Sequence, residues 1–298
     1  MNTPQAAPLN TRALQARAHN VGYTSVRVYP SIDSTNLEAM RLLKDAQLSA
    51  SLGELSAVLT LNQTGGKGRL NRSWSAPAGS CLATTIIVRP RAGARPIAAE
   101  AYHWATQIAA LAVVDIWRAR GARVAGLKWP NDILVSGSKG CGILATLITE
   151  ADGTFSIAVG VGQNLNMTPE QLPVATATSL SIASGSAVDN QGVADDLLEG
   201  FARYWGAFCA AGADPEQSWN KHLGDNGGSL LDRVRACMVT LGTDVSVHLP
   251  DGSRVNGRAV DMDSEGRLVV EAEGRRRVFD VGDVEHLRAA DGTYAPLT

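Results

Sequence analysis

The sequence lacks long hydrophobic runs, closely spaced cysteines and histidines placed for metal binding. Its longest uninterrupted apolar stretch, residues 108–114, is far shorter than the roughly 20 residues that a bilayer-spanning helix needs. The four cysteines include no C-x-x-C pair, and none of the five histidines stands at metal-ligand spacing. We therefore expect free thiols, and neither a transmembrane segment nor a metal cluster.

The chain also lacks an excess of charge of either sign, a secretory signal and a serine hydrolase motif. Its 27 Lys+Arg and 29 Asp+Glu residues give a net charge of -2, which favours neither nucleic acid nor an anionic membrane as a partner. Residues 1–10 lack the basic start and apolar core of a signal peptide, and no G-x-S-x-G elbow is present to recruit a histidine as a base. We expect a cytoplasmic protein that binds no DNA and no membrane.

The length and texture of the chain predict a large domain followed by a small one. A chain of 298 residues with 45% hydrophobic content can bury a substantial core in either arrangement. After about residue 231, short apolar runs alternate with glycine-containing turns, which is typical of an all-β module of about five strands, SH3-like in size. We place the domains at residues 1–232, with residues 1–25 as an N-terminal arm, and at residues 233–298.

The most informative stretch, residues 63–74, directly follows a predicted strand. Its glycines stand beside Lys67, Arg69 and Arg72, so backbone N–H groups can approach an anion that these cations surround. The nucleotide-loop template G-x-x-x-x-G-K-[ST] is not met, because a glycine follows the lysine. The pattern predicts a phosphate-binding loop of another kind, and the alternative is a surface loop of mixed charge.

A cluster of polar residues starts the first predicted helix. After a strand at residues 26–29, Asp33 or Ser34 is expected to cap a helix whose apolar residues follow helical spacing. Capping uses one hydroxyl and leaves Thr35 and Asn36 at a helix N-terminus, where ligands are readily held. The alternative is capping and nothing more.

Apolar periodicity predicts two long helices, at residues 97–120 and 193–211, whose aromatic residues we assign to the core and not to a cofactor site. Apolar, β-branched runs predict strands at residues 80–88 and 154–161. Residues 167–178 show no periodicity and could cover a ligand.

A second polar region lies between the two helices, at residues 126–149. Its pattern predicts a β-hairpin with Lys128 and Asp132 near one strand end and Lys139 entering the next strand. The segment Gly140-x-Gly142-x-x-Ala145 fits a relaxed dinucleotide fingerprint, but that fingerprint must open a helix, and β-branched residues continue this segment as a strand. We therefore reject a dinucleotide site here.

Five motifs follow one another along the chain: Ser34-Thr35-Asn36, Gly66-Lys67-Gly68-Arg69 with Arg72 and Trp74, Lys128-Trp129-Pro130-Asn131-Asp132, Lys139 with Gly142-Ile143-Leu144, and Gly162-x-Asn164. In their order and spacing, these motifs resemble those of biotin protein ligases. The resemblance spans the chain from about residue 26 and implies an α+β fold, in which a class II synthetase-like mixed β-sheet catalytic domain, flanked by helices, precedes a small SH3-like β-barrel. It also implies synthesis of biotinyl-5′-AMP from biotin and Mg-ATP, followed by transfer of biotin to one lysine of a biotin carboxyl carrier protein. Such ligases often dimerise through the sheet, so a homodimer is one expectation.

The resemblance implies a role for each of these residues. Lys139 and Arg69 are the expected catalytic residues, because a carboxylate attacks a phosphate only when cations offset the repulsion between the two anions. Asp132 would hold Mg²⁺ or orient Lys128 and Lys139. The expected biotin-binding residues are Ser34, Thr35, Asn36, Gln63, Gly66, Lys67, Gly68, Arg69, Lys139 and Gly142. The expected ATP- or adenylate-binding residues are Lys67, Arg69, Arg72, Trp74, Lys128, Asn131, Asp132, Lys139 and Asn164.

Three positions depart from the pattern of that family. Lys67 stands for the usual Arg, Asn71 for a common Gly, which should stiffen the loop, and Gly140 for a larger apolar residue, which should loosen the edge of the biotin pocket. Ligases that also repress transcription carry an N-terminal helix-turn-helix domain, for which residues 1–25 leave no room.

Two alternative functions stay open. One is a lipoate or octanoate protein ligase, which the Lys-Trp-Pro-Asn-Asp stretch and the C-terminal barrel disfavour. The other is a non-catalytic biotin-sensing module, which Lys139 and Arg69 disfavour.

Overall fold

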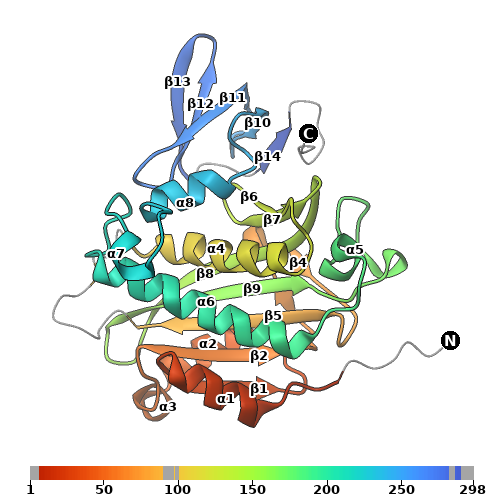
Figure 1. Ribbon diagram of the computed structural model, residues 1–298, viewed down its shortest axis with the longest axis vertical. Helices are drawn as coiled ribbons and strands as arrows, with labels where there is room; N and C mark the ends of the chain where they lie inside the picture. The colour runs from red at the N-terminus through yellow and green to blue at the C-terminus, as the bar shows by residue number, and fades with distance from the viewer. Residues whose placement is uncertain (1–6, 90–96, 98–100, 282–285, 290–298) are drawn as a thin grey trace.

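A seven-stranded mixed sheet forms the centre of the first domain (Figure 1). The computed structural model describes residues 7–89, 97, 101–281 and 286–289. The strands lie in the order β1-β2-β5-β9-β8-β7-β6, and β1 runs parallel to β2 while the other neighbours are antiparallel. Their bounds are β1 (Tyr23–Tyr29), β2 (Leu55–Thr60), β5 (Cys81–Val88), β6 (Gly126–Lys128), β7 (Asp132–Val135), β8 (Ser138–Thr149) and β9 (Phe155–Asn164).

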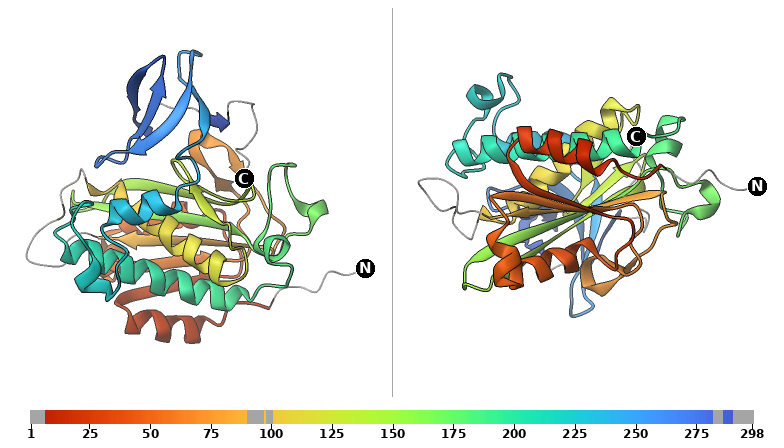
Figure 2. Two further views of the ribbon diagram at one scale, coloured as in Figure 1. Left: turned by 45° about the horizontal axis from the view of Figure 1, so that its top comes forward. Right: turned by 90° about the horizontal axis from the view of Figure 1, so that it is seen from below.

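Helices cover both faces of this sheet, so its central strands are buried on both sides. Figure 2 shows α1 (Thr11–Asn20), α4 (Trp104–Ala119) and α6 (Asn190–Ala210) on one face and α2 (Thr35–Lys44) on the other. Every residue of β2 and β5 is buried. A smaller core lies beneath α2 and includes Ala39, Leu42, Leu43, Val58, Ile87 and Ala158. The shorter helices are α3 (Ala46–Ala50), α5 (Leu180–Ser184) and α7 (Asn220–Leu223), with 3₁₀ turns at Arg69–Asn71 and Pro169–Gln171.

The C-terminal part of the chain forms a five-stranded antiparallel sheet above the first domain (Figure 1). Helix α8 (Leu230–Cys237) leads into it, and the predicted domain boundary at residue 232 falls inside this helix. The strands lie in the order β13-β12-β11-β10-β14, which agrees with the predicted small β domain. Their bounds are β10 (Asp244–His248), β11 (Arg254–Met262), β12 (Leu268–Ala272), β13 (Arg275–Phe279) and β14 (His286–Ala289).

One predicted helix begins later than expected, and one helix of the structure was not predicted. The helix expected over residues 97–120 begins at Trp104, and residues 101–103 before it form a turn, while residues 98–100 lie outside the described part. The N-terminal arm contains α1, which Asn10 caps by accepting a hydrogen bond from the backbone N–H of Ala13. This helix buries few apolar side chains, so its sequence shows little helical periodicity.

Two further predictions from the sequence, on the cysteines and on β8, are confirmed. The four cysteines are free, and β8 is a strand, so the rejected dinucleotide motif does not open a helix. Among the described residues, no helix has the length and apolar character to cross a membrane.

Candidate active site

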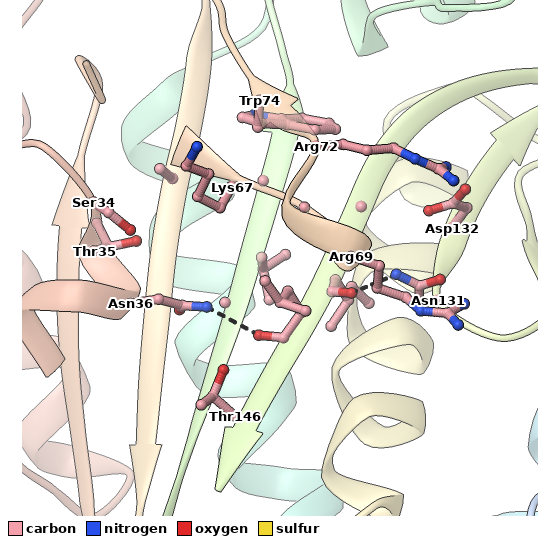
Figure 3. A pocket seen from close by; sticks show the side chains of 18 of the residues that line it. Ser34, Thr35, Asn36, Lys67, Arg69, Arg72, Trp74, Asn131, Asp132 and Thr146 are labelled. Carbon is pink, nitrogen blue, oxygen red and sulfur yellow. Dashed lines mark hydrogen bonds between the residues drawn. The ribbon is translucent and has the colours of Figure 1, made fainter. Parts of the chain in front are cut away.

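A cavity of about 410 Å³ opens between the start of α2, the loop after β2 and the strands β8 and β9. All the site residues predicted from the sequence line it except Gly66 and Asn164. Figure 3 shows Ser34, Thr35 and Asn36 on one side of the cavity and Arg69, Arg72 and Asp132 on the other. The cavity therefore has a neutral polar end and a charged end.

The neutral end is built at the N-terminus of α2. Ser34 is the N-cap, and its hydroxyl accepts a hydrogen bond from the backbone N–H of Leu37 at 3.4 Å. The residue after Ser34 is Thr35, and its backbone N–H donates to Oε1 of Gln63 at 2.9 Å. Ser34 and Thr35 are both buried, so the hydroxyls that remain for a ligand lie in a site largely shielded from water.

The glycine-rich loop is a small hairpin made of β3 (Gly66–Lys67) and β4 (Ser73–Trp74). Gly66 is required there, because a Cβ would lie 2.4 Å from Nε2 of Gln63 and 2.5 Å from the carbonyl oxygen of Trp74. Asn71, near the tip, has φ 61°, a left-handed conformation that Asn tolerates better than most residues. Asn71 thus fits the left-handed backbone of this position.

The Trp74 ring lies directly on two glycines of the sheet. A Cβ at Gly162 would come within 2.9 Å of the indole, and one at Gly142 within 3.3 Å. The ammonium of Lys139 lies 5.4 Å from the centre of the same ring, within the range of a cation–π interaction. Trp74 therefore joins the loop to the strands that carry Lys139.

The charged end of the cavity has a clear excess of positive charge. Nζ of Lys139 lies 2.6 Å from Oδ1 of Asp132, which fixes the ammonium at the junction of β7 and β8. Asp132 is the one acidic residue among the described residues lining the cavity. Such a site favours ligands that carry several negative charges. The basic lining residues are Lys67, Arg69, Arg72, Lys128 and Lys139.

Arg69 connects the loop to the C-terminal domain. Its Nη2 donates to the carbonyl oxygen of Val281 at 3.0 Å. Burial lowers the pKa of the guanidinium and the nearby Arg72 adds to this, while Asp132 raises it. An Arg side chain keeps its charge in spite of such shifts.

Hydrogen bonds join the Trp-Pro-Asn-Asp turn to neighbouring parts of the protein. Nε1 of Trp129 donates to the carbonyl oxygen of Gly266 in the C-terminal domain at 3.0 Å. Nδ2 of Asn131 donates to the carbonyl oxygen of Ile143 at 2.7 Å. These bonds connect the turn to the C-terminal domain and to β8, and the turn fixes the position of Asp132.

Asn164 and Gly140 take part in packing beside the cavity. Nδ2 of Asn164 donates to the carbonyl oxygen of Thr178 at 3.0 Å, so its donor group holds the irregular segment next to Lys139. A Cβ at Gly140 would lie 2.1 Å from the ring of Trp117, so this ring fills the place of a side chain and Gly140 leaves no gap.

Several residues that line the cavity belong to none of the motifs found in the sequence. Gly160 is the exception that could have been found, because a glycine inside a strand often marks a close approach of another group. The lining residues not predicted from the sequence include Leu37, Ser73, Ala83, Thr146, Gly160 and Val161. No cluster of three or more His, Cys, Asp or Glu side chains suited to a metal ion occurs in the described part of the chain.

The chain is similar to known proteins along most of its length. Residues 28–164 match the Biotin/lipoate A/B protein ligase family, and residues 240–287 match the Biotin protein ligase C terminal domain. A Biotin--[acetyl-CoA-carboxylase] ligase of Mycobacterium tuberculosis is 33% identical over 289 residues, which cover 94% of this chain and 97% of the relative. The ligase of the same name from Paracoccus denitrificans is 32% identical over 260 residues, covering 85% and 96%.

A solved structure, that of the biotin protein ligase from Aquifex aeolicus in complex with biotin and ATP, shares the fold. It superposes with a TM-score of 0.68 at 20% identity, and the match covers 90% of this chain and 100% of that one. Together with the sequence matches, this shows that the chain belongs to the biotin/lipoate A/B protein ligase family and, within it, to the biotin protein ligases.

Proposed function

We propose that this protein is an ATP-dependent biotin protein ligase that makes biotinyl-5′-AMP and then transfers biotin to a lysine of a biotin carboxyl carrier protein. The observation that carries the proposal is one cavity with hydroxyl and amide groups at one end, basic side chains at the other, and Lys139 near the basic end. The first end suits the ureido ring of biotin, which needs hydrogen-bond donors and acceptors. The second suits the phosphates of ATP.

In the first step, a carboxylate oxygen of biotin attacks the α-phosphorus of ATP. A bond forms between the carboxylate oxygen and phosphorus, the bond to the bridging oxygen breaks, and pyrophosphate leaves. Lys139 would lie between the two anions and lower their repulsion, and Asp132 and Trp74 keep its ammonium in place. Lys67, Arg69, Arg72 and Lys128 would hold the phosphates.

ATP is expected to bind as its Mg²⁺ complex. One carboxylate together with substrate phosphate oxygens is a common environment for Mg²⁺, and Asp132 offers that carboxylate in the cavity. The ion would neutralise phosphate charge. Since Oδ1 of Asp132 lies beside Lys139, this residue would also position the lysine.

In the second step, the amine of the carrier lysine attacks the carbonyl carbon of biotinyl-5′-AMP. An amide bond forms, the bond to the phosphate oxygen breaks, AMP leaves and the amine loses a proton. The names of the relatives from Mycobacterium tuberculosis and Paracoccus denitrificans support a carrier domain of acetyl-CoA carboxylase as the acceptor. The need for ATP and a carboxylase favours the cytoplasm as the place of reaction.

A homodimer formed through the sheet is part of the proposal. Strand β7 pairs with β8 as far as Gly142, while β8 continues to Thr149 along β9. Leu147 on this part of β8 is 55% exposed. An uncovered strand edge of this kind can pair with a second copy.

A pyrophosphate-release assay tests the proposed function. Purified protein is given Mg-ATP with biotin, lipoate or octanoate, and we expect release with biotin alone. Release with lipoate or octanoate in place of biotin would identify a lipoate-type ligase. Tight biotin binding without release would identify a sensing module.

A further inference from the structure

A row of three paired residues crosses the sheet beneath the start of α2. Thr85 on β5 pairs with Gly160 on β9, and Gly160 pairs with Leu144 on β8. Thr85 is completely buried, and no motif in the sequence marks it. The side chain of Asn36 reaches from α2 to this row, and Figure 3 shows its amide hydrogen bond as a dashed line.

The Asn36 amide is held in one orientation. Its Nδ2 donates to the carbonyl oxygen of Leu144 at 3.1 Å, which turns Oδ1 toward the hydroxyl of Thr85 at 2.6 Å. An amide oxygen can only accept a hydrogen bond, so the Thr85 hydroxyl is the donor in this contact. Gly160 leaves the space that this arrangement needs, because a Cβ there would lie 2.4 Å from Oδ1 of Asn36.

The direction of this hydrogen bond determines what Thr35 offers to a ligand. Oγ1 of Thr35 accepts a hydrogen bond from Oγ1 of Thr85 at 2.8 Å and donates one to Oε1 of Gln63 at 3.2 Å. The single hydroxyl proton of Thr85 is thus shared between Thr35 and Asn36, and Oε1 of Gln63 also accepts from the backbone N–H of Thr35. Thr35 therefore accepts from Thr85 and gives its own proton to Gln63, which leaves one lone pair of its hydroxyl to accept from a ligand in the cavity that Thr35 lines.

We propose that Thr85 is a positioning residue for ligand selection: held in place by Asn36, it donates to the Thr35 hydroxyl and so fixes that hydroxyl as an acceptor for an N–H group of the ligand. This inference rests on the proposed function, since the ureido ring of biotin carries two such N–H groups. A dithiolane ring or an alkyl chain carries none and would leave the buried acceptor of Thr35 unsatisfied. A site built to accept a hydrogen bond rejects ligands that lack the donor.

The test measures biotin binding by calorimetry for the wild type and three variants. Thr85→Val keeps the shape and removes the hydroxyl, while Thr85→Ser restores it. Thr84→Val is the matched control, because Thr84 is the neighbouring residue on the same strand, is equally buried, and its hydroxyl is without a hydrogen-bond partner among the described residues. We expect Thr85→Val to weaken biotin binding by about tenfold, the loss of one oriented hydrogen bond, and Thr84→Val to leave it unchanged.

A selectivity measurement separates this role from a general structural one. Each protein is titrated with the two isomers of biotin that carry a methyl group on one ureido nitrogen. In the wild type, the isomer that lacks the contacted N–H should already have lost the bond to Thr35, so Thr85→Val should weaken it little, while the other isomer loses about tenfold as biotin does. In Gly160→Ala the added methyl group would displace the Asn36 amide. This variant should therefore give the same selective loss.

A common loss for biotin and both isomers, or no loss, would overturn the role of Thr85 while leaving the proposed function intact. Failure of the wild type to bind biotin would overturn both. If Thr85→Val does not fold, the Gly160→Ala series decides by the same criterion.

Discussion

Among single residues, Lys139 carries the largest expected share of the chemistry. It lies in a salt bridge with Asp132, so its removal takes away the cation next to the α-phosphate without opening the core. We expect Lys139→Ala to keep the fold and to lose adenylate formation by roughly 3 to 4 kcal/mol of transition-state stabilisation, as for other electrostatic donors. ATP–pyrophosphate exchange at saturating biotin and ATP measures this, with the exposed Lys221→Ala as control. Near-normal exchange in Lys139→Ala would mean that another cation serves the reaction.

Arg69 is a second single residue with an expected role, in retaining the adenylate after it has formed. Biotinyl-5′-AMP reacts with any amine, so the ligase must keep it enclosed until the carrier docks. A glycine-rich hairpin buries few side chains, and a guanidinium on the hairpin can hold the phosphate through two hydrogen bonds. We expect Arg69→Gly to retain biotin-dependent pyrophosphate release but to lose the adenylate into solution, where it labels bystander lysines. The dissociation rate of biotinyl-5′-AMP and the labelling of added albumin measure this loss. An unchanged rate without albumin labelling would point to Arg72 as the retaining group.

At the scale of secondary structure, a buried ion pair joins α3 to the ends of three strands. Arg89 follows β5 and Glu150 follows β8, and the carboxylate also accepts from Ser49 on α3 and Ser156 on β9. Burial raises the pKa of Glu150, but the hydrogen bonds from Arg89, Ser156 and Ser49 outweigh it and lower the pKa to about 2. The folded pKa lies below the unfolded value of about 4.3, so this contribution to stability is complete above pH ~4.3 and is lost as the pH falls toward 2.

This network gives a pH-dependent prediction. The shift corresponds to about 3 kcal/mol of the free energy of unfolding between pH 7 and pH 2. We expect Glu150→Gln to destabilise the protein at pH 7, since it leaves a buried Arg89 unpaired, and to flatten the dependence of stability on pH in the acid range. Urea unfolding at pH 7 and pH 3.5 measures both, with the exposed Glu216→Gln as control. An acid slope equal to that of the wild type would assign the effect to other carboxylates.

Elements also show what the sequence could and could not predict. Lys139 and Asp132 were expected to lie together because a strand, a turn and a second strand bring them side by side, and local patterns predict such hairpins well. Helix α1 was missed because it buries little apolar surface. The connection between Thr85, Gly160 and Asn36 depends on the pairing of distant strands, and no local pattern encodes that pairing.

At the scale of the whole molecule, the C-terminal domain supports the turn that places Asp132. Trp129 is completely buried, its Nε1 donates to the carbonyl oxygen of Gly266, and its backbone N–H donates to the hydroxyl of Thr240 at 2.9 Å. Both partners lie after α8, so the predicted catalytic turn rests on residues outside the first domain. The two domains should therefore unfold together, and damage at their contact should reach the active site.

Trp129→Phe tests this coupling. The variant leaves the buried carbonyl of Gly266 without its donor, which costs about 1 to 3 kcal/mol, and it loosens the turn next to Lys139. Trp219→Phe is the matched control, because Trp219 is equally buried while its Nε1 has no hydrogen-bond partner among the described residues. Both variants lose ring volume and should unfold at a lower temperature, but we expect Trp129→Phe alone to raise the KM for ATP, because the turn that it loosens carries Asp132. If the two variants change the KM for ATP equally, the contact with the C-terminal domain supports stability and has no separate influence on the nucleotide site.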